Sequence, residues 1–140
     1  MTTDTGSEAP RLSVVMVNYN TTELAVDSLQ SLRRLVGHDG IEVIFVDNAS
    51  RGFEPGAVLA AWPEARIVAS DENLGFGRGN NLGAEVARGE YLWLLNTDTL
   101  IPEDHGLWSM VAFLDDHPDY AAVSPLLADD DGTVQPWQTA

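Results

Sequence analysis

Amide and carboxylate side chains recur where buried strands are predicted to end. Each of the seven asparagines lies at or just beyond the carboxyl end of such a strand, or in the helix turn that follows: Asn18, Asn20, Asn48, Asn73, Asn80, Asn81 and Asn96. Asp47 and Asp98 share these positions. Ligands of open α/β sheets bind in the crevice outside the carboxyl ends of the strands. Asn and Asp favour turns and caps in any protein, but four such loops in succession favour a ligand site.

The tripeptide Asn96-Thr97-Asp98 directly follows a predicted buried strand. Residues two apart in an extended segment point the same way, so the Asn96 amide oxygen and the Asp98 carboxylate could reach one hard cation. Mg²⁺ and Mn²⁺ suit such oxygen ligands, and Mg²⁺ bridges to substrate phosphates in many sites. Three residues of these types also make an ordinary turn cap. Beside the other polar loops, however, they predict a divalent-metal site.

The segment NLGFGRGNNLG, residues 73–83, contains four glycines. Glycine allows the backbone to approach a ligand closely at a helix N-terminus. The segment is not a dinucleotide fingerprint, because Asn80 occupies the third glycine position after Gly75 and Gly77. Arg78 lies within this loop, where it could contact a phosphate or be a solvated surface side chain, and the sequence leaves both interpretations open.

The charge balance excludes several kinds of site. The 140 residues contain 22 Asp plus Glu and 7 Lys plus Arg, a formal net charge of −15. All seven basic residues are arginines, so the lysine chemistry of P-loop proteins, kinases and Schiff-base enzymes is excluded. The acidity argues against nucleic acid as a partner. A phosphate ligand would need a metal ion, backbone amides or a helix N-terminus as its positive partner.

Apolar runs and helical spacing alternate along the chain. The apolar runs predict strands at residues 12–17, 41–46, 66–69, 90–95 and 120–123, with a further short strand at 133–135. Helical spacing predicts helices from residue 21 or 22, at 58–61, at 76–88 and on the stripe of Leu107, Met110, Val111 and Leu114. This order predicts an α/β fold, with a mostly parallel, doubly wound sheet and helices on both faces. We expect a disordered leader at residues 1–11 and one domain over 12–140.

Five motifs in this order resemble the N-terminal half of a family 2 glycosyltransferase, closest to its rhamnosyltransferase-like branch. They are VNYN at 17–20, VDNAS at 46–50, NLGFGRGNNLG at 73–83, ARGEYLWLLNTDT at 87–99 and the DDDG turn. The resemblance runs from about residue 12 to residue 135 and implies the GT-A fold. It also implies a hexosyltransferase that binds a UDP- or dTDP-linked sugar with Mg²⁺ or Mn²⁺. Transfer would proceed with inversion to a hydroxyl group of a glycan or lipid-linked acceptor.

The resemblance also assigns residues. Tyr19 and Asn20 resemble the first nucleotide-contacting turn, and Asp47 resembles the carboxylate that binds the pyrimidine base, with Asn48 beside it. The loop over the ribose and diphosphate corresponds to Asn73, Gly75, Arg78, Asn80 and Asn81. Asp98 matches the metal-binding end of the family's Asp-x-Asp motif, with Asn96 in place of its first Asp. The exchange removes one formal charge, so we expect weaker metal binding with Asp98 as the essential ligand.

The family's second half, with the acceptor region and the general base, has no counterpart in the sequence. No catalytic residue is identifiable, because the DDDG cluster at 129–132 is typical of a solvated hairpin turn. We therefore expect a truncated fold with an unfinished sheet edge and uncovered apolar surface, completed by a second chain or a missing C-terminal half. The alternative is a non-catalytic module that binds a nucleotide or nucleotide-sugar. A receiver-like signalling domain is a third interpretation, and the absence of lysine argues against it.

The N-terminus, MTTDTGSEAP, has no apolar segment of the kind a secretory signal requires. No apolar run approaches the roughly 20 residues of a membrane span. The sequence therefore predicts a cytoplasmic protein, with peripheral attachment at the inner face of the membrane as a further expectation.

Overall fold

The computed structural model describes residues 9–103 and 105–136. The chain divides into two compact units, residues 1–105 and residues 106–140. Most of the predicted leader, residues 1–8, lies outside the described residues. Arg11, at the end of that leader, is already attached to the sheet, because its backbone N–H donates to the carbonyl of Gly40 at 2.8 Å. The expectation of a single domain over 12–140 stays a prediction.

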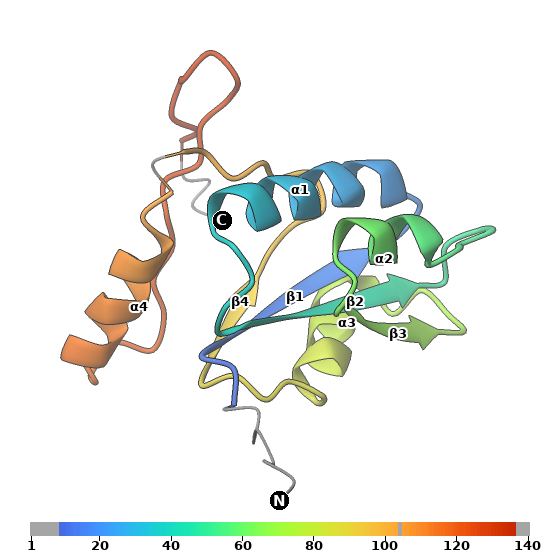
Figure 1. The fold of residues 1–140 in the computed structure, drawn as a ribbon, viewed down its shortest axis with the longest axis horizontal. Coiled ribbons are helices and arrows are strands. Elements are labelled where there is room, and N and C mark those ends of the chain that lie inside the picture. The colour runs from blue at the N-terminus through green and yellow to red at the C-terminus, as the bar shows by residue number, and fades with distance from the viewer. Residues whose placement is uncertain (1–8, 104, 137–140) are drawn as a thin grey trace, which may run out of the picture. The chain divides into compact units, whose positions relative to one another are not determined.

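The first unit is built on a four-stranded sheet in the order β3-β2-β1-β4 (Figure 1). Its strands are β1 (Leu12–Asn18), β2 (Ile41–Asn48), β3 (Arg66–Ser70) and β4 (Tyr91–Leu94). All three strand pairs are parallel, with Val15 of β1 opposite Ile44 of β2 and Leu94 of β4. The central strands β1 and β2 are almost entirely buried, as their continuous apolar sequences predict. The prediction of a parallel α/β sheet is confirmed.

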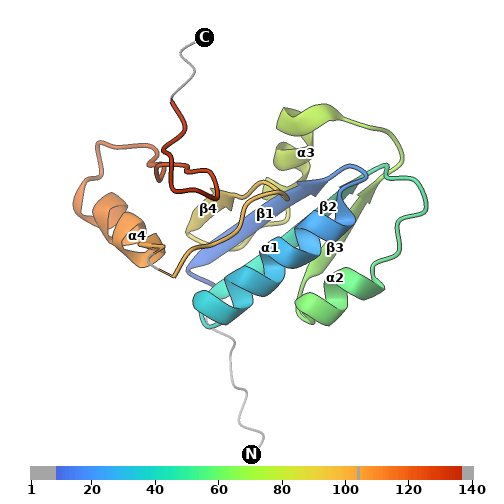
Figure 2. The same cartoon turned by 90° about the horizontal axis from the view of Figure 1, so that it is seen from above.

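Helices cover both faces of this sheet, as predicted (Figure 2). The helices α1 (Thr22–Leu35) and α2 (Gly56–Ala61) lie on one face, and α3 (Gly75–Ala84) lies on the other. The core under α3 consists of Val15, Ile44 and Val46, against which Leu82 and Val86 pack. The predicted helix at 76–88 is shorter than expected. Beyond Ala84 the chain makes tighter turns, with backbone bonds from Val86 to Gly83 and from Ala87 to Ala84.

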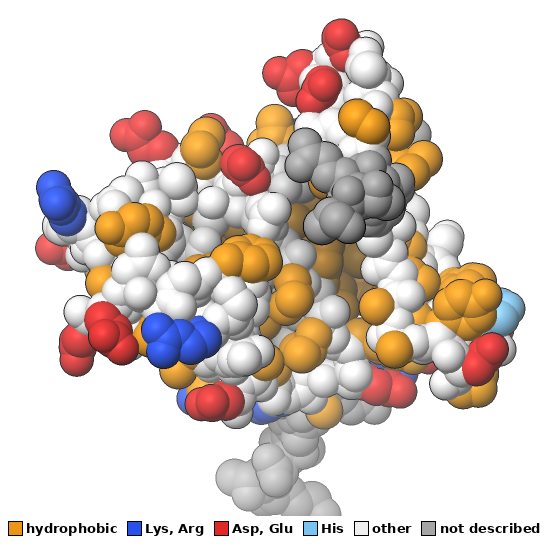
Figure 3. All heavy atoms as spheres, turned by 180° about the vertical axis from the view of Figure 1, so that it is seen from behind, with side chains coloured by type: hydrophobic (Ala, Val, Ile, Leu, Met, Phe, Trp, Pro, Cys, Tyr) orange, Lys and Arg blue, Asp and Glu red, His pale blue; other side chains and the backbone are white. Residues whose placement is uncertain are grey.

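The fourth strand is less buried than its apolar sequence predicts. Leu92 and Leu94 are 49% and 50% exposed, so the prediction that this strand is buried on both faces is wrong. The reason is its place in the sheet, since β4 is an outer strand with β1 as its one neighbour in the described chain. Within the described residues β4 thus ends the sheet and presents apolar side chains at the surface, and the expectation of an edge completed by another segment stays a prediction. Hydrophobic side chains also reach the surface on the face shown in Figure 3.

The second unit contains α4 (Leu107–Asp116), which begins after the left-handed Gly106. Leu107 and Val111 are its buried residues, in agreement with the predicted stripe. Residues 120–123 form no strand, so the prediction of a fifth strand there is wrong. Tyr120 instead packs its ring edge against Phe113, with centroids 5.1 Å apart. The segment is exposed and has no strand beside it in the described residues, and β-structure requires such a neighbour.

The DDDG cluster forms a tight turn, as predicted. The backbone N–H of Gly132 donates to the carbonyl of Asp129 at 2.8 Å, and Gly132 has a φ of 82°. The short strand expected at 133–135 is reduced to a single antiparallel bridge between Ala128 and Val134.

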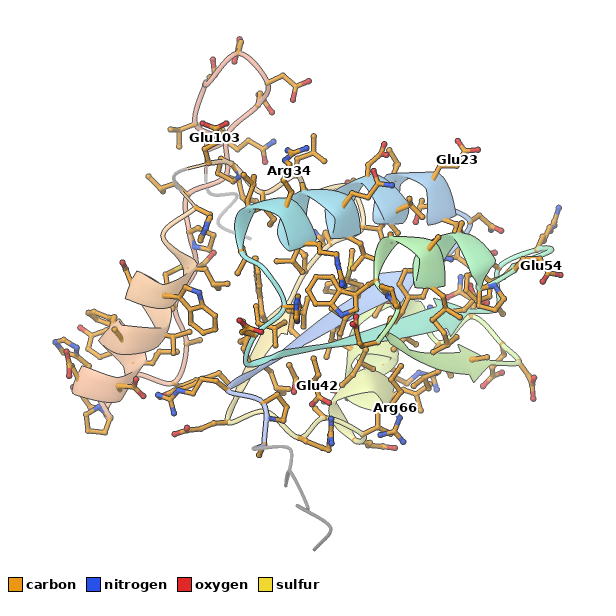
Figure 4. All side chains as sticks on the ribbon, in the orientation of Figure 1. Glu23, Arg34, Glu42, Glu54, Arg66 and Glu103 are labelled. Atoms are coloured by element: carbon orange, nitrogen blue, oxygen red, sulfur yellow. The ribbon has the colours of Figure 1, made fainter. Side chains whose placement is uncertain are left out.

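A carboxylate at the amino ends of the strands anchors the connection between α3 and β4. Glu42, labelled in Figure 4, accepts hydrogen bonds from the Ser13 hydroxyl at 2.6 Å and from the Arg88 backbone N–H at 2.5 Å. The Arg88 guanidinium adds a bond at 3.1 Å, and the Glu42 side chain is only 11% exposed. Burial raises the pKa of Glu42, but the bonds from Ser13 and Arg88 together outweigh burial and lower the pKa below its usual value.

We expect Glu42→Gln to destabilise the protein by about 1–2 kcal/mol near pH 7, because charged hydrogen bonds are lost. A lowered carboxyl pKa contributes stability above the unfolded-state pKa that disappears as the pH falls through the folded-state pKa. The difference in melting temperature between wild type and Glu42→Gln should therefore be constant above about pH 5 and shrink below pH 4.5, the ordinary glutamate value.

The matched control is Glu64→Gln. Glu64 also pairs with an arginine, Arg33, at 2.9 Å, but its side chain is 60% exposed. The control should change the melting temperature much less than Glu42→Gln does. Equal losses from the two substitutions would contradict an anchoring role for Glu42.

Candidate functional site

The carboxyl ends of the four parallel strands bring the predicted polar loops to one edge of the sheet. At the end of β1, the fully buried Asn18 lies between two of these loops. Its amide nitrogen is 3.0 Å from Asp47 Oδ1, 3.0 Å from Ser50 Oγ and 3.1 Å from Thr22 Oγ1. Its amide oxygen accepts from the backbone N–H of Thr21 at 3.2 Å. Asn18 thus joins the β1–α1 turn to the end of β2.

Asp47, the predicted base-binding carboxylate, is almost fully buried. Its Oδ1 accepts from the Asn18 amide, and its Oδ2 accepts from the backbone N–H of Ser50 at 3.2 Å. An ionised carboxylate has about four acceptor positions, so these two bonds fix its orientation and leave capacity for a ligand N–H.

Two non-glycine residues in the left-handed region lie at the ends of β1 and β2. They are Asn20 with a φ of 58° and Ala49 with a φ of 63°. Ser50 Oγ accepts from the Asn20 backbone N–H at 2.9 Å, and Asn20 Oδ1 accepts from the Arg51 N–H at 2.9 Å. Such conformations cost on the order of 1 kcal/mol or more and cluster at ligand sites. The side chain of Tyr19, next to Asn20, is 47% exposed and so available to a ligand.

Asn48 is buried and shapes the loop before α3. Its amide oxygen accepts from the Leu74 N–H at 2.8 Å, and its amide nitrogen donates to Asn73 Oδ1 at 2.9 Å. Asn73 Oδ1 also accepts from the N–H of Gly75, whose φ of 76° favours glycine. These bonds use both ends of the Asn48 side chain, so its contribution to a ligand would be the shape of this loop.

Three further predicted residues lie on α3. Asn80 is buried, and its amide donates to the Phe76 carbonyl at 3.0 Å. Asn81 is exposed. Arg78 is exposed too, but it is not simply solvated, because its Nε donates to the Leu74 carbonyl at 3.1 Å. The structure thus links Asn48, Asn73 and Gly75 directly, while Arg78 and Asn81 lie on the adjoining helix.

The turn after β4 alternates between buried and exposed side chains. Asn96 and Asp98 are exposed, and Thr97 between them is only 9% exposed. In the described part of the chain neither Asn96 nor Asp98 makes a side-chain hydrogen bond, so both are free to bind a cation. The described residues hold no group of three His, Cys, Asp or Glu suited to a metal ion. One carboxylate and one amide oxygen nevertheless fit Mg²⁺ or Mn²⁺, because Mg²⁺ keeps several waters and shares its remaining positions with substrate phosphates.

Four residues without a role predicted from the sequence hold this edge together: Asn18, Thr21, Ser50 and Thr97. Asn18 stood among the asparagines at strand ends, and its place as the last residue of a buried strand was the signal available. The sequence gives no signal for the contacts of Ser50 with Asn18 or of Thr97 with Thr21, because these join positions 32 and 76 apart.

A hollow of about 630 Å³ lies beside these residues, between the N-terminus of α1 and the loop before α2. Its lining includes Glu23, Arg51, Phe53 and Glu54, and Figure 4 shows Glu23 and Glu54 at the same end of the sheet. Among the described residues that line the hollow, Asn20 is the one predicted site residue. The hollow therefore adjoins the predicted site and does not coincide with it.

A sequence model of one protein family, Glycosyl transferase family 2, matches residues 13–140. The chain belongs to this family. The succinoglycan biosynthesis protein ExoO of Rhizobium meliloti is 31% identical to it over 98 residues, which is 69% of this chain and 28% of ExoO. The glycosyltransferase GlyG of Streptococcus pneumoniae is 27% identical over 97 residues, 66% of this chain and 32% of GlyG. The chain thus spans about a third or less of the curated relatives it matches.

Solved structures of transferases share the fold of this family 2 chain. The mannosyltransferase PcManGT of Pyrobaculum calidifontis, in complex with GDP-Man and Mn²⁺, superposes with a TM-score of 0.67 at 27% identity. That superposition covers 77% of this chain and 33% of PcManGT. Residues 1–349 of S. aureus TarS, in complex with UDP, give a TM-score of 0.62 at 22% identity, with 77% and 33% covered. The fold is the GT-A fold, as the sequence motifs predict.

No helix within the described residues is long and apolar enough to cross a membrane.

Proposed function

We propose that this chain is the donor-binding part of a family 2 glycosyltransferase and binds a nucleotide-diphospho-sugar together with Mg²⁺ or Mn²⁺. The whole protein would transfer the sugar with inversion to a hydroxyl group of a glycan or lipid-linked acceptor. The observation that carries the proposal is the meeting of two features at one sheet edge. These are the oriented carboxylate of Asp47 and the turn that presents Asn96 and Asp98.

Each loop has a role in this proposal. Tyr19 would contact the base, and Asp47 would accept a base N–H with its remaining lone pairs. The loop that Asn48 and Asn73 shape would lie over the ribose and diphosphate, where Gly75 lets the backbone approach closely. Asn20 would contribute to the first turn, and Arg78, Asn80 and Asn81 to the diphosphate end.

Asn96 and Asp98 would hold the cation by their side-chain oxygens. The cation, when bound, supplies the positive charge that the leaving diphosphate requires. The chain has 22 acidic residues and no lysine, so a metal ion and backbone amides would balance the charge of the ligand. The acceptor hydroxyl also needs a general base. None of the described residues is assigned that role, so a second chain or a C-terminal half would supply it.

The similar proteins support this class of donor. PcManGT was solved with GDP-Man and Mn²⁺, and TarS was solved with UDP and with UDP-GlcNAc. The sequence motifs favour UDP or dTDP for this chain, and GDP joins them as a candidate through PcManGT. A cytoplasmic location with peripheral attachment at the inner face of the membrane stays a prediction.

Calorimetric titration of the chain with UDP, dTDP and GDP, each with Mn²⁺ and again with EDTA, tests the proposal. We expect at least one nucleotide to bind with Mn²⁺ and to lose about tenfold or more in affinity with EDTA, because the phosphates and the protein share the cation. Absence of binding to all three with Mn²⁺ would contradict the proposal. The alternative, a non-catalytic binding module, predicts the same binding. A longer natural form that transfers sugar from the bound nucleotide would exclude that alternative.

A further inference from the structure

We infer that Thr97 is a positioning residue, which fixes the turn carrying Asn96 and Asp98 through a relay of side-chain hydrogen bonds that ends at Asp47. The inference rests on the proposed function, because it concerns the separation of the base-binding carboxylate from the metal-binding turn. The relay, as we call it, consists of Thr97, Thr21, Asn18 and Asp47. Its members come from four separate places in the chain, namely the β4 turn, the α1 N-terminus and the ends of β1 and β2.

The distances define a continuous chain of contacts. Thr97 Oγ1 lies 3.0 Å from Thr21 Oγ1, which lies 3.1 Å from Asn18 Oδ1. The amide nitrogen of Asn18 lies 3.0 Å from Asp47 Oδ1. Three of the four side chains are buried or nearly so, with Asn18 fully buried, Asp47 4% exposed and Thr97 9% exposed, and Thr21 is half-buried. Thr21 is the one side-chain partner of the Thr97 hydroxyl within the described residues, so losing their bond is costly at a position this little exposed.

The chemistry of the groups sets the direction of every bond in the relay. The Asn18 amide oxygen can only accept, so the single hydroxyl proton of Thr21 is directed to Asn18. Thr97 must therefore donate its own proton to Thr21 Oγ1. The Asn18 amide in turn donates to the Asp47 carboxylate. All three bonds run toward Asp47, and hydrogen bonds aligned in this way strengthen one another.

A second attachment holds the other end of the turn. The backbone N–H of Ile101 donates to Ser31 Oγ at 3.1 Å. Ser31 lies in α1, and Thr21 is the N-cap residue of the same helix. The segment 97–101 is thus bound to α1 at both ends. Thr97 is buried against Thr21, and its neighbours Asn96 and Asp98 are exposed. Fixing Thr97 therefore fixes where these two side chains are presented.

The two ends of the relay match the two ends of a nucleoside diphosphate. In the proposed binding mode, the base of such a ligand contacts Asp47, and its phosphates contact the cation at Asp98. Sites hold their ligand groups accurately when supporting hydrogen bonds lock the side chains beneath them. The relay would keep this separation constant before the ligand arrives, so less ordering is needed on binding.

The test compares Thr97→Val, which keeps the shape of the side chain and removes its hydroxyl, with Thr97→Ser, which restores the hydroxyl. The matched control is Thr99→Val, because the Thr99 side chain lies in the same turn and makes no hydrogen bond within the described residues. Each variant is titrated with UDP, dTDP and GDP, in Mn²⁺ and in EDTA. Amide hydrogen exchange at Thr99 and Ile101 and the melting temperature are also measured. Thr97→Ala gives the same measurements should Thr97→Val not fold.

We expect Thr97→Val to weaken nucleotide binding in Mn²⁺ roughly five- to tenfold, as the loss of one hydrogen bond implies. Binding in EDTA should not change, Thr97→Ser should recover most of the affinity, and Thr99→Val should match wild type. If Thr97→Val bound nucleotide in Mn²⁺ as tightly as the wild type, the inference would be overturned. An equal loss of affinity with and without Mn²⁺ would overturn it too, because a merely structural role has that effect.

Hydrogen exchange separates this inference from the proposed function. Should the wild type bind no nucleotide, the proposed function fails, and the exchange rates alone decide on the relay. Faster exchange at Thr99 and Ile101 in Thr97→Val, but not in Thr99→Val, would support a relay that holds the turn. Unchanged exchange in Thr97→Val would overturn it.

Discussion

Asp98→Asn is expected to remove metal-dependent nucleotide binding and to leave the fold intact. Asp98 is the single carboxylate in the turn at residues 96–99, and Asn96 in the same turn supplies a neutral amide oxygen. Replacing Asp98 by Asn leaves two neutral amides, which are poor ligands for a hard cation. Loss of a supporting residue around a metal ligand typically costs 10- to 100-fold in affinity. Loss of the ligand itself should therefore lower the affinity for Mn²⁺ by at least about 100-fold, so that nucleotide affinity in Mn²⁺ falls to the value measured with EDTA.

The same substitution should have little effect on stability. Asp98 is exposed and makes no side-chain hydrogen bond in the part of the chain that the structure describes. Substitutions of this kind change the free energy of unfolding by about 0.5 kcal/mol or less. Calorimetric titration in Mn²⁺ and in EDTA measures the first effect, and thermal unfolding measures the second.

Asp27→Asn is the control for charge. It removes one negative charge from an exposed position on α1, so it changes the net charge by the same amount without touching the turn. We expect it to bind nucleotide like the wild type. An Asp98→Asn variant with wild-type affinity in Mn²⁺ would refute the proposed role of Asp98 in metal binding.

Gly83→Ala is expected to destabilise the protein, although alanine is the better helix former. A Cβ atom at Gly83 would lie 2.4 Å from Val15 Cγ1 and 3.1 Å from Val46 Cγ2. Both valines are fully buried, and a β-branched side chain in a packed sheet has few alternative rotamers. Overpacking of this kind costs about 1–3 kcal/mol, against a helix-propensity gain of about 1 kcal/mol. We therefore expect a net loss, measured as a lower midpoint of urea unfolding.

Gly77→Ala is the matched control in the same helix. A Cβ atom there meets nothing within 4 Å, so the substitution gains helix propensity without overlap. We expect it to stabilise the protein by up to about 1 kcal/mol. A Gly83→Ala variant as stable as Gly77→Ala would show that α3 can move away from β1 at no cost and would contradict the expected overlap with Val15.

The strands illustrate how far the sequence predicts the fold. LSVVMV and IEVIFV predicted β1 and β2 correctly, because a central parallel strand needs apolar residues on both faces. YLWL at β4 has a similar composition, yet Leu92 and Leu94 are half exposed. The sequence of residues 120–123 also predicts a strand, but the structure has no strand there. Burial of a strand depends on its neighbours in space, and local composition alone does not specify which neighbours a strand has.

For the candidate site, the amino-acid sequence is enough to predict the family, the GT-A fold and the kinds of side chain at each strand end. The parallel topology then required these loops to meet at one edge of the sheet. The role of each polar residue at this edge depends on the three-dimensional packing. This packing buries Asn18 and Asn48 among loop contacts, exposes Asn96 and Asp98, and links Thr97 to Thr21 across 76 positions of sequence. Residue type limits what a side chain can bond, but its partner depends on the packing of distant segments at distances near 3 Å.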